Sequence, residues 1–196
     1  MQVVIDTSSL LSLVRYYLPF DKDFVLFNFI KGRIVAGEIV ILDAILEESK
    51  YISSGIILKS LSYLTDKSFL KENKLPINTA DILPPAPKKF YRQVDNQFVN
   101  GVIKNNLSPV QYENRKTVFL NSPDMILILF CLNLKKDNLF EEIYLVTEET
   151  ERNNDSKLFK KIPLICKELE IKTLCLPQLL EKYDKVNFEF KTKSSI

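Results

Sequence analysis

The sequence predicts an α/β fold with three layers, in which helices cover both faces of a mainly parallel sheet. Short segments rich in Val and Ile, such as residues 2–5 and 39–42, alternate with longer segments whose apolar residues have helical spacing. The short segments are apolar at successive positions, which is typical of strands buried on both faces. This alternation favours parallel strands joined by right-handed crossovers.

The first expected strand, residues 2–5, leads into a helix that Ser8 or Ser9 can cap. The next expected elements are a helix at residues 22–31 ended by Gly32, a strand at 39–42, and a helix that Asp43 caps and that extends past Ile52.

The strongest helix start in the chain lies at residues 121–124. Ser122 can cap it, and Pro123 fits the first helical position, where its missing N–H has no intrahelical partner in any case. This helix is expected to run to about Lys135. A strand at residues 143–146, a helix at 163–170 and a last strand at 171–176 are expected to follow.

The 196 residues have the length of one domain, so residues 1–196 are predicted to form a single domain. Regular patterns weaken in residues 61–120, where a proline-rich segment precedes an expected helix from residue 88 to about residue 104. We interpret residues 61–120 as a helical insertion. The polar tail at residues 188–196 is expected to be mobile.

The composition is that of an ordinary globular protein, with 46% hydrophobic and 27% charged residues. The net charge is only +2, so any nucleic-acid surface must be local. There is no histidine, which excludes general acid/base catalysis by histidine and the usual zinc patterns. With no Cys-x-x-Cys pair and no apolar run long enough to cross a bilayer, a reduced cytoplasmic protein without a membrane segment is expected.

Acidic residues occur where the expected parallel strands end. Asp6 follows the first strand, Glu48 lies in the helix after the second, Glu149 follows the strand at residues 143–146, and Asp124 opens the most apolar helix. Ligands in open α/β sheets bind at the carboxyl ends of the strands. Carboxylates that converge without a cation would repel one another, so the pattern indicates a site for Mg²⁺ or Mn²⁺ and metal-assisted phosphodiester hydrolysis.

Each acid also has a simpler interpretation that the sequence leaves open. Asp6 can serve as a helix cap, and Asp124 suits the first turn of a helix because of the helix dipole. Glu149 can belong to a solvated acidic loop. Glu48 lies on an apolar helix face, where an unpaired carboxylate is unfavourable, whereas Glu47 is expected to be solvated.

Four segments, in family order, resemble the PIN-domain nucleases, the fold of many toxin/antitoxin ribonucleases: Val-Val-Ile-Asp-Thr-Ser-Ser-Leu-Leu at 3–11, Ile-Leu-Glu-Glu at 45–48, Ser-Pro-Asp-Met-Ile-Leu at 122–127 and Val-Thr-Glu-Glu at 146–149. The family usually has Asp where Glu149 stands. The Thr-Glu-Glu motif, followed by Lys-Ile-Pro and Cys166, is similar to a less-characterised branch of PIN-like proteins. The resemblance does not cover residues 61–120.

The resemblance implies a sheet of about five strands and a Mg²⁺- or Mn²⁺-dependent endoribonuclease, plausibly the toxin partner of an antitoxin protein and a homodimer. It implies Asp6, Glu48, Asp124 and Glu149 as the catalytic, metal-binding acids, supported by Thr7, Thr147, Glu47 and Glu148. The alternative is a PIN-like module that binds RNA or protein without cleaving. An aspartate-nucleophile phosphatase is less compatible, since Ser8 stands where that class has a second Asp.

Lys88, Lys89 and Arg92 combine positive charge with neighbouring aromatic residues, a composition that can hold single-stranded RNA. The competing interpretation is the solvated face of an amphipathic helix whose Phe90 and Val94 point into the core. The sequence predicts the helix in either case.

Overall fold

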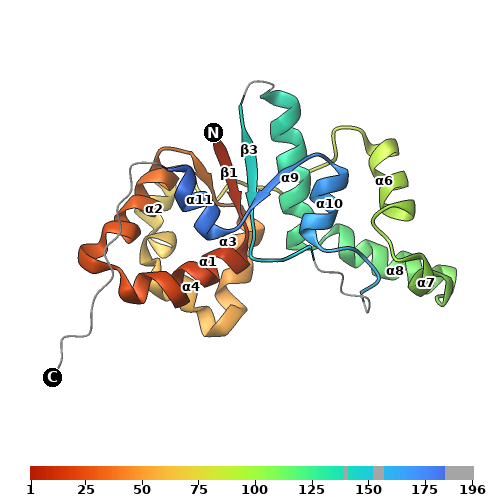
Figure 1. Ribbon diagram of the computed structural model, residues 1–196, viewed down its shortest axis with the longest axis horizontal. Helices are drawn as coiled ribbons and strands as arrows, with labels where there is room; N and C mark the ends of the chain where they lie inside the picture. Colours follow the sequence, from red (N-terminus) through yellow and green to blue (C-terminus); the bar gives the residue numbers. More distant parts are fainter. Residues whose placement is uncertain (139–140, 152–156, 184–196) are drawn as a thin grey trace.

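Parallel strands form the centre of the protein in the computed structural model, which describes residues 1–138, 141–151 and 157–183. The strands are β1 (Gln2–Ile5), β2 (Ile39–Val40), β3 (Ile143–Val146) and β4 (Lys172–Leu174), all parallel, in the order β2-β1-β3-β4. The predicted α/β class with a parallel sheet is therefore confirmed. β1 and β3 run side by side with α9 beside them (Figure 1).

The expectation of about five strands is wrong for the described residues, which contain four. β2 stops after Val40, and Leu42 makes only an isolated parallel bridge with Ile77. Beyond that bridge, the backbone N–H of Thr79 donates to Asp43 Oδ2 (3.0 Å) instead of to a neighbouring strand. A side chain thus takes the hydrogen bond that a fifth strand would need.

Helices surround the sheet and account for most of the other described residues. Their bounds are α1 (Thr7–Ser12), α2 (Val25–Val35), α3 (Asp43–Tyr51), α4 (Ile56–Ser60), α5 (Lys67–Glu72), α6 (Pro87–Asn96), α7 (Gly101–Asn105), α8 (Pro109–Leu120), α9 (Pro123–Asp137), α10 (Ile162–Glu168) and α11 (Leu176–Lys182). α1 continues into a π-helical turn at Leu13–Tyr17. Short 3₁₀ turns occur at Leu18–Phe20, Lys22–Phe24, Ile52–Gly55 and Ser62–Thr65.

Three expected helix bounds are wrong. α2 continues through Gly32 and ends where Gly37 has a positive φ of 71°. α3 stops at Tyr51 because Ser53 and Ser54 adopt left-handed φ angles of 51° and 58°. The helix expected over residues 88–104 is two helices, because Asn100 accepts hydrogen bonds from the backbone of α7 and starts it anew.

The cap assignments near the sheet also differ from expectation. Asp6, rather than Ser8 or Ser9, is the N-cap residue of α1, and Leu42, rather than Asp43, that of α3. The start of α9 is confirmed, since the Ser122 hydroxyl accepts from Met125 N–H (3.3 Å) and Pro123 occupies the first helical position.

Part of the core lies between the sheet and α9, and buried residues of α1, α2, α3 and α4 continue it. Val3, Val4 and Ile5 are fully buried, and α9 packs against β3 and β1 with Met125, Leu127 and Ile128 facing inward. Cys166 is buried in the same core, and burial raises the pKa of its thiol to about 12, so it is a packing residue at neutral pH.

Residues 61–120 contain helices and irregular segments but no strand longer than an isolated bridge. In Figure 1, α6, α7 and α8 lie together on the side of α9 away from β1. Within the described ranges, no single helix has the length and apolar character to span a membrane; α8 and α9 meet the test only as a pair, bent by 61°. The predicted tail at residues 188–196 lies outside the described residues.

Candidate active site

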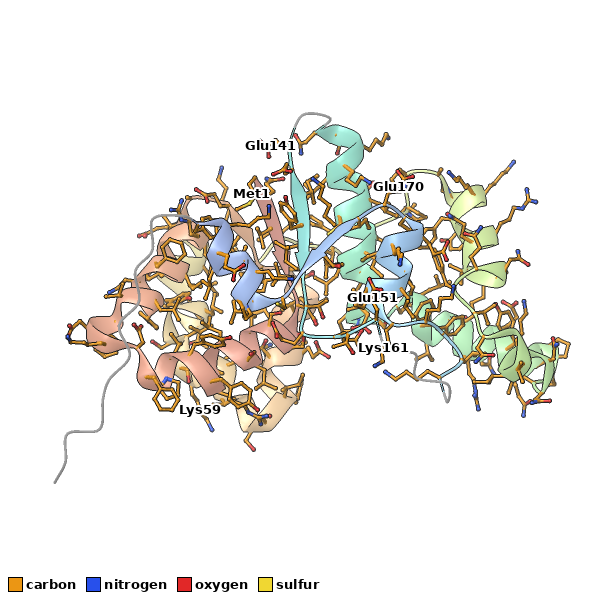
Figure 2. All side chains as sticks on the ribbon, viewed as in Figure 1. Met1, Lys59, Glu141, Glu151, Lys161 and Glu170 are labelled. Carbon is orange, nitrogen blue, oxygen red and sulfur yellow. The ribbon has the colours of Figure 1, made fainter. Side chains whose placement is uncertain are left out.

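The predicted acids lie near the carboxyl edge of the sheet. Figure 2 shows Met1 and Glu141, which precede β1 and β3, at one edge, and Glu151, which follows β3, at the other. Sheet pairing continues one residue beyond the strands, because Asp6 N–H donates to Val146 O (2.9 Å) and Thr147 N–H donates to Leu174 O (3.0 Å). The turns that carry Asp6 and Thr147 are therefore fixed side by side.

Asp6 is buried, with 5% of its surface exposed, and its side chain makes no capping hydrogen bond to α1. Instead, the hydroxyls of Ser8 and Thr147 both donate to its Oδ2 atom, the latter at 2.9 Å. Helix capping therefore does not explain this carboxylate. Its hydrogen bond with Thr147 orients it toward the chain that follows β3, where Glu148 and Glu149 lie.

Glu48 approaches from α3. It is half-buried, and the Thr7 hydroxyl donates to its Oε2 atom, which links α3 to the start of α1. Glu47 is exposed and pairs with Lys50 and Tyr51 instead. The two adjacent glutamates therefore have different surroundings, and Glu48 is the one that faces the β1 turn.

The two glutamates after β3 also make different hydrogen bonds. Glu148 accepts from Leu176 N–H (2.8 Å) and from the Ser9 hydroxyl (3.2 Å), so it ties the start of α11 to α1. Glu149 accepts from Ile162 N–H (3.1 Å) at the start of α10. Its own N–H donates to the Thr147 hydroxyl (3.2 Å), which connects Glu149 to Asp6 through one side chain.

Asp124 lies in the first turn of α9, and the charges of the other three acids affect its pKa. Desolvation, followed by the negative charges of Asp6, Glu149 and Glu48, raises the pKa of Asp124 to about 7, while Lys157 acts in the opposite direction. The residue keeps an exposed surface, so a cation from solvent has access to it. The helix dipole alone would favour the charged form. The raised pKa therefore reflects crowded negative charge.

These side chains fit a hard divalent cation in donor type, because all of them offer oxygen atoms. Among the residues described, no group of three acids, histidines or cysteines is close enough to enclose a metal ion. Mg²⁺ typically keeps several waters and uses only one or two carboxylates together with substrate phosphates. The described acids therefore do not form a closed metal cage, and a cation bound to them would keep several of its waters.

Lys88, Lys89 and Arg92 lie on α6, outside this cluster of acids. All three are exposed, while Phe90 and Val94 on the other face of α6 are buried. The amphipathic helix is thus confirmed, and its exposed face is basic.

Sequence reasoning missed three participants in the site. Ser8 is hydrogen-bonded to Asp6 and accepts from Glu148 N–H (3.0 Å), and its position two residues after Asp6 was a signal for such contact. The N–H of Ile162 and the charge of Lys157 reach the site from a segment that is distant in sequence. No local pattern marks either of them.

No protein-family model, no curated protein and no solved structure matches this chain. The geometry of the site therefore carries the functional argument.

Proposed function

We propose that this protein is a Mg²⁺- or Mn²⁺-dependent endoribonuclease with a three-layer, PIN-like architecture. The observation that carries the proposal is that the Thr147 hydroxyl joins Asp6 to the backbone of Glu149, and the Thr7 hydroxyl holds Glu48 beside the same turn. The negative charges of these three acids also act on Asp124. Acids that stabilise a fold are normally surrounded by donors, and perturbed groups of this kind are enriched at functional sites.

In this proposal, one or two of the acids Asp6, Glu48, Asp124 and Glu149 would bind the cation directly, and the others would bind it through water. When bound, it would supply Lewis-acid stabilisation of charge on the phosphodiester and on the oxygen that leaves. Hydroxyls from Ser8 and Thr147 fix the direction of Asp6, and the Thr7 hydroxyl fixes Glu48. These contacts preorganise the acids so that little rearrangement is needed when substrate binds.

The proposal is tested by cleavage of a labelled single-stranded RNA in Mg²⁺ or Mn²⁺. Asp6→Asn and Asp124→Asn are each expected to reduce the rate by about 100-fold or more, because each removes a charged ligand. Asp137→Asn is the matched control, since Asp137 is exposed at the other end of the same helix, about 20 Å away. Cleavage that survives in both site variants, or in chelator, would exclude this function.

The cellular role as a toxin with an antitoxin partner, the homodimeric state and the cytoplasmic location rest on the resemblance and belong to the proposal. A co-purified inhibitory protein encoded beside this chain would support the first of these.

A second candidate function is RNA or protein binding without cleavage. It is favoured by the hydrogen bond from Ile162 N–H to Glu149, which gives that carboxylate a structural use, and by the absence of a closed acid trio in the described residues. Titration with Mn²⁺ separates the two candidates. A folded protein that binds RNA but takes up no Mn²⁺ at millimolar concentration would favour the second.

A further inference from the structure

Positive charge is concentrated in residues 87–120, the part of the chain that holds α6, α7 and α8. This region contains six Lys or Arg residues and two Asp or Glu residues, a net charge of +4 against +2 for the whole chain. Lys104 and Lys116 are engaged with Asp95 and Tyr112. The other basic side chains of residues 87–120 can therefore bind a molecule outside this region.

The outer face of α6 carries most of that remaining charge. Lys88, Lys89 and Arg92 are exposed, and none of them forms an ion pair within the described part of the chain. They line a shallow groove together with three amide side chains, and its lining residues are Lys88, Lys89, Arg92, Gln93, Asn96 and Gln97. Tyr91, beside them, is 37% exposed. Cations for phosphates, amides for base edges and an aromatic ring for stacking are the groups that bind single-stranded nucleic acid.

A short segment connects the end of α6 to the acids. Lys160 N–H donates to Phe98 O (2.8 Å), and Asn100 N–H donates to Leu158 O (2.8 Å), so residues 158–160 pair with residues 98–100. Phe159 also stacks on Phe119 of α8 at 4.0 Å between ring centroids. The helical region formed by residues 87–120 thereby packs against the segment that leads into α10.

The same segment reaches the site at its two ends. Lys157, which is exposed, interacts electrostatically with Asp124, and Ile162 N–H holds Glu149. In Figure 1, α10 lies between α9 and α6, with the segment passing below it. Residues 157–162 therefore connect the neighbourhood of Asp124 and Glu149 to the chain that directly follows α6.

We propose that single-stranded RNA bound at the four acids continues past Lys157 onto the outer face of α6, where Lys88, Lys89 and Arg92 contact its phosphates. This inference deepens the proposed function and rests on it. The helical region that the family resemblance does not cover is, in this proposal, the part of the protein that holds the substrate.

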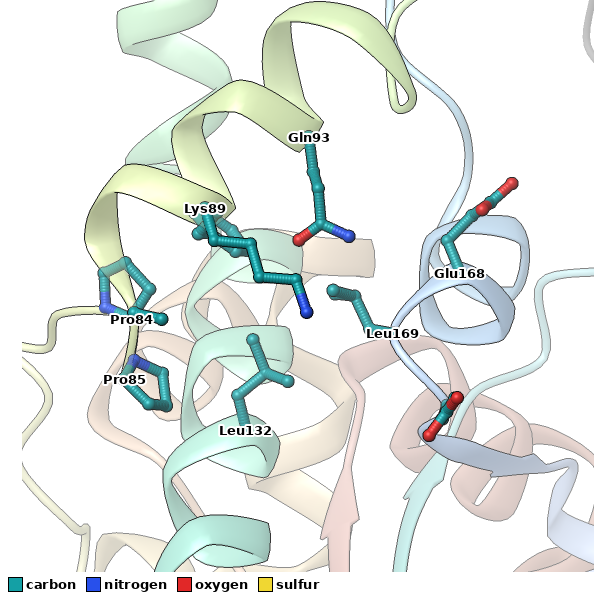
Figure 3. A pocket seen from close by; sticks show the side chains of 10 residues that line it. Pro84, Pro85, Lys89, Gln93, Leu132, Glu168 and Leu169 are labelled. Carbon is teal, nitrogen blue, oxygen red and sulfur yellow. The ribbon is translucent and has the colours of Figure 1, made fainter.

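A neighbouring cleft limits where the backbone of the RNA can lie. This cleft, of about 250 Å³, separates α6 from the end of α10, and Figure 3 shows Lys89 and Gln93 directed into it toward Leu132 and Leu169. Glu168 and Glu170 form its opposite wall. Their carboxylates would repel phosphates from that wall, so the RNA backbone must stay on the α6 side, where Lys89, which lines both this cleft and the groove with Lys88 and Arg92, can still contact it.

The test measures binding by fluorescence anisotropy with labelled oligouridines of about 4, 8 and 16 nucleotides. Asp6→Asn protein is used so that the RNA stays intact, and wild-type protein in chelator serves as a second non-cleaving form. Affinity is expected to rise with length until the strand spans from the acids to α6. Equal affinity for all lengths would overturn the proposal, as would tighter binding of a matched RNA duplex.

The decisive comparison uses two triple variants that remove the same charge. Lys88→Gln/Lys89→Gln/Arg92→Gln is expected to weaken binding of the longest RNA by about 10-fold or more and to reduce the slope of log affinity against log salt by about 2, since each single-strand phosphate contact contributes about 0.7. Lys157→Gln is expected to reduce the slope by about 0.7. The control, Lys59→Gln/Lys67→Gln/Lys71→Gln, changes exposed lysines of α4 and α5 and is expected to leave the slope near the wild-type value.

Two outcomes separate this inference from the nuclease proposal. If RNA is cleaved but both triple variants bind alike, the nuclease survives and the path over α6 is wrong. If no RNA is cleaved but only the α6 variant loses binding, the path stands and the nuclease is wrong.

Discussion

Asp95 in α6 and Asp124 in α9 are both helical aspartates, but their surroundings have opposite charge. Asp95 accepts from the Tyr112 hydroxyl (2.7 Å) and pairs with Lys116 (2.7 Å). Burial acts to raise the pKa of Asp95, but these donors hold it below its usual value. Burial and three neighbouring acids raise the pKa of Asp124 to about 7. A carboxylate surrounded by donors keeps its charge and stabilises the fold, whereas one surrounded by acids keeps its proton to a higher pH.

The largest effect on stability is expected at the donor-rich aspartate. Asp95→Asn should lower the free energy of unfolding by about 2 kcal/mol, because it weakens two hydrogen bonds to a carboxylate and removes the nearer acidic partner of Lys116, leaving only Glu113 at 3.6 Å. The Lys116 side chain is only 15% exposed, so solvent replaces that partner poorly. Urea denaturation near pH 7 measures the change, with Asp137→Asn as the exposed control. An unchanged midpoint would show that the network around Asp95 does not stabilise the fold.

A smaller loss of stability is expected from a change at Thr147, whose hydroxyl bonds both a carboxylate of the site and a backbone N–H. Its buried hydroxyl donates to Asp6 and accepts from Glu149 N–H, so Thr147→Val leaves a partly buried N–H unpaired and removes a donor from Asp6. The free energy of unfolding should fall by about 1.5 kcal/mol. Thr117→Val, at an exposed position in α8 where the hydroxyl bonds only Glu113 O, should change it by less than about 0.5 kcal/mol. Equal losses in the two variants would mean that the Thr147 hydroxyl has no special role.

The elements that sequence could predict are those with strong local signals. The strands at Gln2–Ile5 and Ile143–Val146 are uninterrupted apolar segments, and α9 starts at a Ser-Pro pair that fixes its first turn. Because the ends of parallel strands share an edge, those strands also predict that Asp6 and Glu149 approach each other.

The features that sequence could not predict depend on packing between distant segments. The break after α3 requires Ser53 and Ser54 to adopt left-handed conformations, which serine does not favour. The charge of Lys157 acts on Asp124 from a segment whose next residues, 158–160, pair with residues 98–100. The helical region therefore contributes to the site through a contact that has no signature in either segment.

The comparison of aspartates can be sharpened with a divalent cation. Mg²⁺ or Mn²⁺ at about five times its dissociation constant should stabilise the wild-type protein by about 1 kcal/mol, because it binds the folded acids and not the unfolded chain. Asp124→Asn should reduce that gain, whereas Asp95→Asn should leave it intact. Thermal unfolding with and without the cation, at matched ionic strength, measures both. A gain that is the same in wild type and Asp124→Asn would place the cation elsewhere.

The smallest effect concerns the pH dependence of Asp124 without divalent cations. Because its folded-state pKa of about 7 lies above the value of about 3.9 in unfolded chains, the folded protein binds the proton more tightly, and the contribution of this group to stability falls as pH rises between those values. Asn carries no such proton. Asp124→Asn should therefore match the wild type near pH 4 and become more stable with rising pH, levelling off above about pH 7. Solvent screening at this exposed residue should keep the gain below about 1 kcal/mol. Paired urea denaturations across this range measure it, and a constant difference between the two proteins would show that the neighbouring acids do not act on Asp124.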